Sequence, residues 1–176
     1  MIDATLVEAA ARPRGDGESC DEDARFAKKE GKAGSVYGYK AHIGMDQYSE
    51  LIRTALITSA NVNETSVADQ LIRFDEKAVY ADKAKAERRQ MLKAADIKDF
   101  IMHESSGEGP KLSHWQRRQN RLISPIRARV EPVFAVFKKH MGYRHVRYIG
   151  LIKNQAQLLL LALAYNMRRA AVLASP

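Results

Sequence analysis

The chain has 176 residues, of which 45% are hydrophobic and 28% charged, a composition that is typical of one globular domain and excludes a collagen-like or largely disordered chain. Its 29 Lys and Arg against 21 Asp and Glu leave a net charge of +8. That charge favours a polyanionic partner, and a solvated basic surface without a specific partner is the alternative. Cys20 is the single cysteine, which excludes an internal disulfide and a Cys-pair zinc finger.

The chain carries no pattern of a secreted or membrane protein. No basic flank precedes the first short apolar run, so we expect no signal peptide. The longest apolar run, residues 158–165, is too short to span a bilayer and predicts a buried helix instead. We therefore expect a cytoplasmic protein that does not contact the membrane.

The first half of the chain predicts strands around one charged insertion. A strand-like fragment opens the chain, and residues 12–35 are so rich in charge and glycine that they predict a loop or a partly disordered insertion. Residues 36–46 and 51–60 are β-branched and aromatic and predict two strands joined by a polar turn. Residues 61–74 have apolar positions at helical spacing after an Asn/Thr-rich start, which predicts a helix.

The second half alternates between strands and helices. We expect strands at 77–82 and 97–104, a charged helix at 83–96, a loop at 104–113, helices over 115–141 interrupted at Pro125, a linker at 142–150 and an apolar-faced helix at 151–172. This order predicts a single α/β domain, residues 1–176, with a mixed sheet flanked by helices.

Two aspartates follow short apolar segments. Asp82 ends the predicted strand AVYAD, and ligands gather beyond the carboxyl ends of strands in such sheets. On position alone, an N-cap for a helix beginning at Lys83 is the more common role for this residue. Asp3 has a similar place after Met1 and Ile2, but an aspartate at a strand end is by itself weak evidence of a site.

Glu131 is the only acid in a basic region. Between residues 111 and 147 there are ten Lys and Arg, and Arg127, Glu131 and Lys138 share one helical face. An ordinary i, i+4 ion pair with Arg127 is one interpretation. A lone acid would repel DNA unless a cation lay between them, so the second interpretation is a metal site. Pro132 marks either the first turn of a new helix or a kink.

Asp3, Asp82 and Glu131 together could hold two Mg²⁺ ions, because Mg²⁺ prefers oxygen ligands and also binds phosphate. Such a pair of ions, about 3.5–4 Å apart, promotes phosphodiester displacement. Arg127 and Lys138 would then hold DNA phosphates. Further DNA contacts are expected from Lys139 and from a group on one helix: Trp115, Arg117, Arg118 and Arg121. For Trp115, packing at a helix start is an equal alternative.

Four stretches resemble the DDE-type transposases of bacterial insertion sequences, in the insertion sequence five group. These are IDATLVEAA, YGYKAHIGMD with TSANVNE, VYADKA, and the long segment from IRARVEPVF to YNMRRA. The glutamate motif of the family is Tyr, two residues, Arg, three residues, Glu, six residues, Lys or Arg, and this chain supplies Arg127, Glu131 and Lys138 at that spacing. Ser124 stands where the motif has Tyr, and Lys85 where the family often has an aromatic residue.

The resemblance implies a ribonuclease-H-like fold and a catalytic triad of Asp3, Asp82 and Glu131 that binds two Mg²⁺ or Mn²⁺ ions. It further implies cleavage of double-stranded DNA at transposon ends, strand transfer into target DNA, a homodimer or larger assembly on DNA, and a place in the bacterial cytoplasm near the nucleoid. The N-terminal DNA-binding domain of the family has no counterpart here, so we expect a shortened first strand and a truncated copy. The alternatives are a non-catalytic DNA-binding remnant that occupies transposon ends, and an unfolded product.

Overall fold

The computed structural model describes residues 1–13, 20–28, 34–82, 86–103 and 111–175. Its strands are β1 (Ile2–Glu8), β2 (Arg25–Lys28), β3 (Ser35–Met45), β4 (Ile52–Ser59), β5 (Ala78–Ala81) and β6 (Lys98–Ile101). Its helices are α1 (Glu64–Leu71), α2 (Ala86–Ala94), α3 (His114–Arg127), the 3₁₀ turn η1 (Ala128–Val130), α4 (Glu131–His140) and α5 (Leu151–Ala174). The predicted strands at 36–46 and 51–60 and the helix in 61–74 are confirmed.

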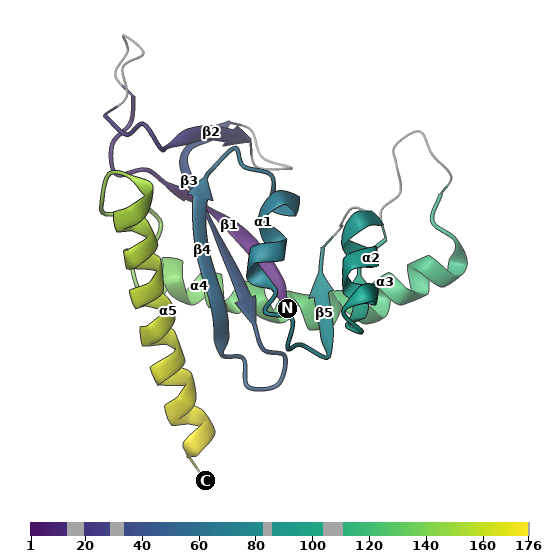
Figure 1. The fold of residues 1–176 in the computed structure, drawn as a ribbon. Helices are drawn as coiled ribbons and strands as arrows, with labels where there is room; N and C mark the ends of the chain where they lie inside the picture. Colours follow the sequence, from purple (N-terminus) through teal and green to yellow (C-terminus); the bar gives the residue numbers. More distant parts are fainter. Residues whose placement is uncertain (14–19, 29–33, 83–85, 104–110, 176) are drawn as a thin grey trace.

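The main sheet is built on the long strand β3. β1, β2 and β4 all pair with β3 in antiparallel orientation, with Asp3 opposite Ile43 and Ile57 opposite Ala41. Because the inward side chains of β3 are apolar, Tyr39, Ala41 and Ile43 are fully buried in the main core. In Figure 1, β1, β3 and β4 stand between the green helices behind them and α1 in front.

The strand β2 corrects the prediction of an uninterrupted loop over residues 12–35. Arg25–Lys28 pairs with Ser35–Gly38 of β3, and Phe26 stacks at an angle on Tyr37 with 4.8 Å between ring centroids. The sequence did not predict this strand because three of its four residues are exposed, so it has no apolar pattern. It is held by backbone pairing at a sheet edge.

Gly38 of β3 lies where the sheet comes close to β1. A Cβ atom added there would lie 2.2 Å from the Val7 carbonyl oxygen, inside any permitted contact. Glycine is therefore required for β1 and β3 to approach each other at this end of the ladder.

β5 and β6 form a separate parallel pair, with Ala81 opposite Ile101. Their buried side chains pack with Leu92 of α2 in a second core, and Ile2 of β1 packs against that core. The chain thus has the predicted α/β class, a mixed set of strands covered by helices, of the ribonuclease-H-like kind. In the described residues the parallel pair is not hydrogen-bonded to the main sheet.

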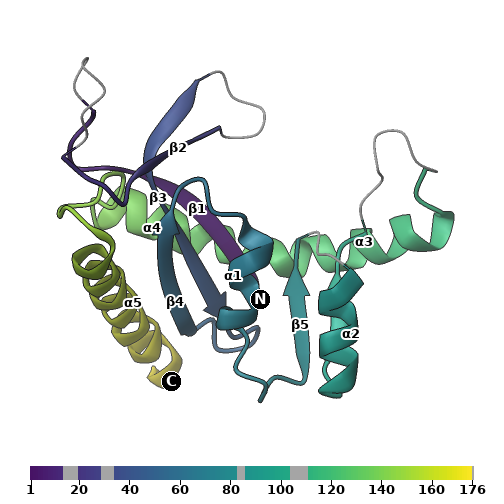
Figure 2. The same cartoon turned by 45° about the horizontal axis from the view of Figure 1, so that its top comes forward.

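α3, η1 and α4 form a nearly continuous rod behind the sheet (Figure 2). α3 begins with a reciprocal capping box between Ser113 and Gln116. The predicted break at Pro125 is wrong, because α3 continues through it to Arg127. The rod instead changes from α-helical to 3₁₀ geometry at η1. Pro132, in the first turn of α4, has no N–H to donate the α-helical hydrogen bond there.

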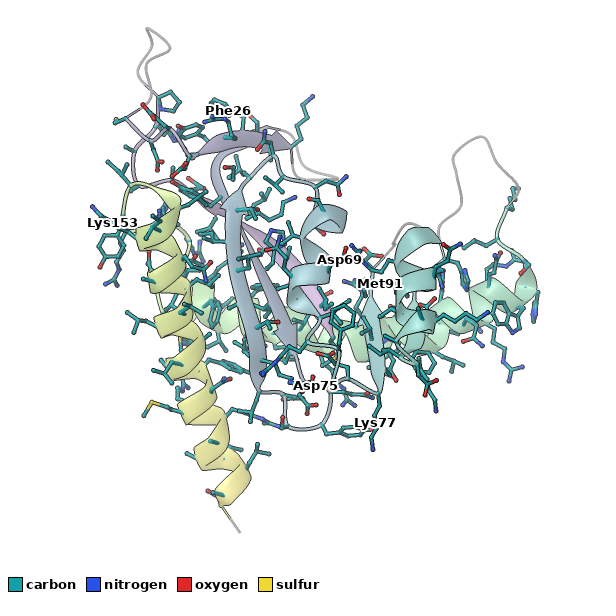
Figure 3. All side chains as sticks on the ribbon, viewed as in Figure 1. Phe26, Asp69, Asp75, Lys77, Met91 and Lys153 are labelled. Atoms are coloured by element: carbon teal, nitrogen blue, oxygen red, sulfur yellow. The ribbon has the colours of Figure 1, made fainter. Side chains whose placement is uncertain are left out.

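α5 packs one face on β4 and leaves the other exposed. Within residues 158–165 only Leu158 and Ala162 are buried, whereas Leu160 is 66% exposed, so the prediction of a buried helix is wrong for half of its circumference. Gln155 bonds the backbone of β4 at Ala55 and Ile57. Figure 3 shows Lys153 pointing outward from the first turn of α5. No helix in the described part of the chain is long and apolar enough to cross a membrane.

Candidate active site

The first predicted acid, Asp3, projects from β1 toward the helical rod. Successive strand residues point to opposite faces, so Asp3 and Thr5 share the face that meets α3 and α4. The Asp3 side chain is only 19% exposed. Burial raises the pKa of Asp3 to about 6, with smaller contributions from the charges of Glu64 and Glu131, while the amide of Ala4 and the charge of Arg127 act in the opposite direction. Asp3 is therefore a carboxylate that gains from a nearby cation.

Arg127 supplies such a cation. One terminal nitrogen lies 3.6 Å from Asp3 Oδ2 and the other lies 3.8 Å from Glu131 Oε1. The expected Arg127–Glu131 pair is present, and the contact with Asp3 is an addition that the helical spacing could not reveal. The Arg127 side chain is 18% exposed, and its Nε atom is buried without a hydrogen-bond partner in the described part of the chain.

Glu131 is held at the junction of η1 and α4, and its side chain is 63% exposed. The inner face of α4, with Val133 and Phe137, is buried in the main core, so Glu131 is carried on a fixed helix. Asp3 and Glu131, which are far apart in sequence, therefore meet around a single guanidinium group.

Lys138 makes a second connection between rod and strand. Its Nζ atom donates to Thr5 Oγ1 at 2.7 Å and to the Leu6 carbonyl oxygen at 2.9 Å. The sequence assigned Lys138 to DNA, and its role in holding β1 was missed. Thr5 is two residues after Asp3 and Lys138 is seven after Glu131, so each pair shares one face of its element, but this periodicity does not show that the two faces meet.

Asp82 follows the end of β5 and is exposed. β5 lies beside β1 in both views, and Ile2 packs against the core that contains Ala81 (Figures 1 and 2). The described part of α2 begins at Ala86, and the predicted helix start at Lys83 lies outside the described residues, so the N-cap alternative for Asp82 stays a prediction. Lys85, at the departure from the family motif, lies outside the described residues. The convergence of Asp82 with Asp3 and Glu131 stays a prediction.

The donor chemistry of the three acids fits a divalent cation. Carboxylate oxygens are the ligands that Mg²⁺ and Mn²⁺ prefer, and a cationic group already bridges two of them. Within the described residues, no three His, Cys, Asp or Glu side chains converge closely enough to form a ready metal site. The assignment of Asp3, Asp82 and Glu131 as metal ligands therefore stays a prediction.

The remaining predicted DNA contacts lie on the rod. Arg117, Arg118 and Arg121 are exposed on α3, and Lys139 is exposed near the end of α4. Trp115 is 60% exposed and its ring lies 5.6 Å from that of His103, so it is only partly packed. These groups leave cationic and aromatic surface open to an anionic polymer, whereas Arg127 and Lys138 bind protein groups.

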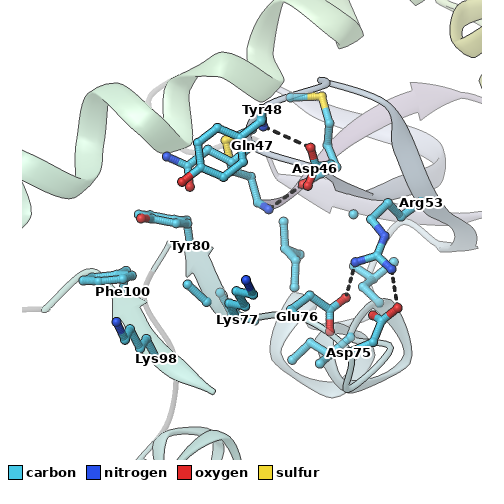
Figure 4. Close-up of a pocket in the computed structure, with 18 residues that line it drawn as sticks. Asp46, Gln47, Tyr48, Arg53, Asp75, Glu76, Lys77, Tyr80, Lys98 and Phe100 are labelled. Carbon is cyan, nitrogen blue, oxygen red and sulfur yellow. Dashed lines mark hydrogen bonds and ion pairs between the residues drawn. The ribbon is translucent and has the colours of Figure 1, made fainter. Parts of the chain in front are cut away.

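A cavity of about 620 Å³ lies at the N-terminal end of β1, between Met1, Ile2 and the β5–β6 pair. Figure 4 shows its wall of Tyr80 and Phe100, which are stacked with 4.8 Å between ring centroids. Its acids Asp75 and Glu76 are paired with Arg53 at 2.6 and 3.5 Å. The three predicted catalytic acids do not line this cavity, so it is separate from the candidate site.

Comparison with known proteins identifies the family of the chain. No solved structure matches the chain. The model of the family described as "Transposase DDE domain" matches residues 1–167, which is nearly the whole chain and includes β1, β5 and the rod. The protein therefore belongs to the DDE transposase domain family.

Proposed function

We propose that this chain is a transposase catalytic domain that cleaves DNA at transposon ends and joins the freed 3′-hydroxyl to target DNA. The observation that carries the proposal is the meeting of Asp3 and Glu131 around Arg127 within a DDE transposase domain. The motif spacing further supports a place in the insertion sequence five group.

Asp3, Asp82 and Glu131 are proposed to hold two Mg²⁺ or Mn²⁺ ions. Bound there, the ions supply activation of the attacking hydroxyl and stabilisation of the leaving oxygen. The protein contributes rigid placement: β1 carries Asp3 in a seven-residue ladder, and α4 carries Glu131 on a buried helical face. The exposed arginines of α3 are proposed to hold DNA phosphates, and two copies of the chain to pair two DNA ends.

A non-catalytic DNA-binding protein is the second candidate. It is favoured by one observation, that the described acids do not form a ready group of three. Such a protein would use the basic rod alone and would occupy transposon ends without cutting them.

Calorimetric titration with Mn²⁺ separates the two. The catalytic proposal predicts sub-millimolar binding that Asp82→Asn and Glu131→Gln both abolish. Asp96→Asn is the matched control: Asp96 is exposed at φ 55°, a conformation that asparagine also tolerates. A Mn²⁺-dependent nicking assay on supercoiled plasmid, with the same variants, tests the activity. Absence of Mn²⁺ binding in a chain that melts cooperatively would leave the non-catalytic candidate.

A further inference from the structure

We propose that Arg127 is a releasable internal counter-ion: it neutralises Asp3 and Glu131 in the metal-free protein, is displaced when a divalent cation binds, and then becomes available to a DNA phosphate. This inference rests on the proposed function, because it concerns the same acids. It assigns to Arg127 a step that precedes any contact with DNA.

The geometry of the ion pairs favours displacement. The two contacts of Arg127 measure 3.6 and 3.8 Å, beyond hydrogen-bond length. Two other arginines of the same protein form ion pairs with short hydrogen bonds: Arg89 donates to Asp99 at 2.6 Å, and Arg53 donates to Asp75 at 2.6 Å. Arg127 thus neutralises its acids by charge, without the short directed bonds that would lock it in place.

The guanidinium of Arg127 is also incompletely satisfied. Its Nε atom is buried and has no hydrogen-bond partner among the described residues. A buried donor without an acceptor is unfavourable, so the observed position costs free energy that release would recover. A phosphate oxygen could accept from this atom and from a terminal nitrogen together, in the two-pronged geometry that suits guanidinium groups.

The two acids have different freedom to respond. Asp3 lies on a strand whose seven residues all pair with β3, and it is 19% exposed, whereas Glu131 is 63% exposed and can adjust its rotamer. A cation that approaches from solvent would meet Glu131 first and then compete with Arg127 for Asp3. Arg127 and the metal ion cannot both neutralise Asp3 and Glu131, so the contact of Arg127 with these acids weakens metal binding, and metal binding weakens that contact.

The test is Mn²⁺ calorimetry on the full chain with Arg127→Gln and, as matched control, Arg129→Gln, which removes the same charge from an exposed position on η1. We expect Arg127→Gln to bind Mn²⁺ about tenfold more tightly than Arg129→Gln, a coupling of ordinary size. We also expect Arg127→Gln to melt at a lower temperature than Arg129→Gln in EDTA, and Mn²⁺ to remove that difference.

A purely structural role for Arg127 predicts the opposite sign. If Arg127→Gln binds Mn²⁺ equally or more weakly than the control while the natural chain binds it, the counter-ion inference is overturned and the proposed function stands. If none of the three proteins binds Mn²⁺, both fail together.

A second measurement uses the natural chain, in case the variant does not fold. The side-chain Nε–H signal of Arg127 in ¹H–¹⁵N spectra should shift on addition of diamagnetic Mg²⁺ and shift again with a short DNA duplex. A signal that stays unchanged at saturating Mg²⁺ would show that Arg127 is not released.

Discussion

Lys138 of α4 donates a 2.7 Å hydrogen bond to Thr5 of β1, and Arg127, which lies earlier on the same rod, contacts Asp3 of the same strand. Thr5 follows Asp3 by two residues on a strand, and Lys138 follows Glu131 by seven on a helix. The two contacts therefore fix the register of the rod against β1, and with it the separation of the two acids. Lys138 is in this respect a positioning residue.

Lys138→Met should destabilise the protein, because it removes bonds to Thr5 Oγ1 and the Leu6 carbonyl while keeping the length of the side chain. We expect a loss of about 1–2 kcal/mol in the free energy of unfolding, measured by urea titration. Lys139→Met is the matched control, since Lys139 is exposed, and it should weaken DNA binding and leave stability unchanged. Equal stability of the two variants would contradict the positioning role.

Two buried tyrosines should respond in opposite ways to loss of the hydroxyl group. Tyr39 donates to Asp21 at 2.6 Å, whereas the hydroxyl of Tyr143 is buried without a partner in the described part of the chain. Tyr39→Phe should cost about 1–3 kcal/mol, and Tyr143→Phe should be neutral or slightly stabilising. Thermal unfolding of both variants checks this. A Tyr143→Phe protein that unfolds as early as Tyr39→Phe would show that the Tyr143 hydroxyl is satisfied.

The parts of this fold that the sequence reveals are those in which burial follows a simple period. β3 and β4 alternate or run apolar because the core lies against them. Residues 25–28 carry no such pattern, since β2 is an exposed edge strand. The exposure of the outer face of residues 158–165 could not be predicted, because the hydrophobicity of a segment does not say which of its faces packs against another element.

The pairings of the candidate site residues could not be predicted from the sequence. The spacing of Arg127, Glu131 and Lys138 gives one helical face, but which strand that face meets depends on the tertiary fold. The contacts with Asp3 and Thr5 join residues more than a hundred positions apart, beyond the reach of any local pattern. For the same reason, the place of β5 beside β1 follows from packing of Ile2 against the second core rather than from the sequence of β5 itself.

His42 should make the protein less stable in acid. Burial, assisted by the charge of Lys40, lowers the pKa of His42 to about 4, below its ordinary value of 6.5. Folding therefore favours the neutral ring, whose stabilising contribution is complete above pH 6.5 and is lost as the pH falls from 6.5 toward 4, by at most about 1.4 kcal/mol per pH unit. His42→Gln keeps a polar partner for Thr58 and removes this titration.

Urea midpoints of the natural chain and His42→Gln between pH 7.5 and 4.5 check the prediction. The natural chain should lose stability more steeply below pH 6.5 than the variant. Met1 and Asp3, whose pKa values burial moves to about 6, titrate in both proteins and cancel in the comparison. Parallel curves would mean that His42 binds its proton in the folded state as readily as in the unfolded one.

The exposed arginines of α3 should govern the salt dependence of DNA binding. Each phosphate that they neutralise releases counterions, so the combined change of Arg117, Arg118 and Arg121 to Ala should reduce the slope of log K against log salt by up to about 2.7. Because all three side chains are exposed, the melting temperature should not change. The control removes three exposed lysines from the β5–β6 side of the molecule, Lys77, Lys93 and Lys98, which matches the lost charge. A DNA surface confined to the rod predicts a smaller change of slope in this control, whereas equal changes would mean that affinity follows net charge alone.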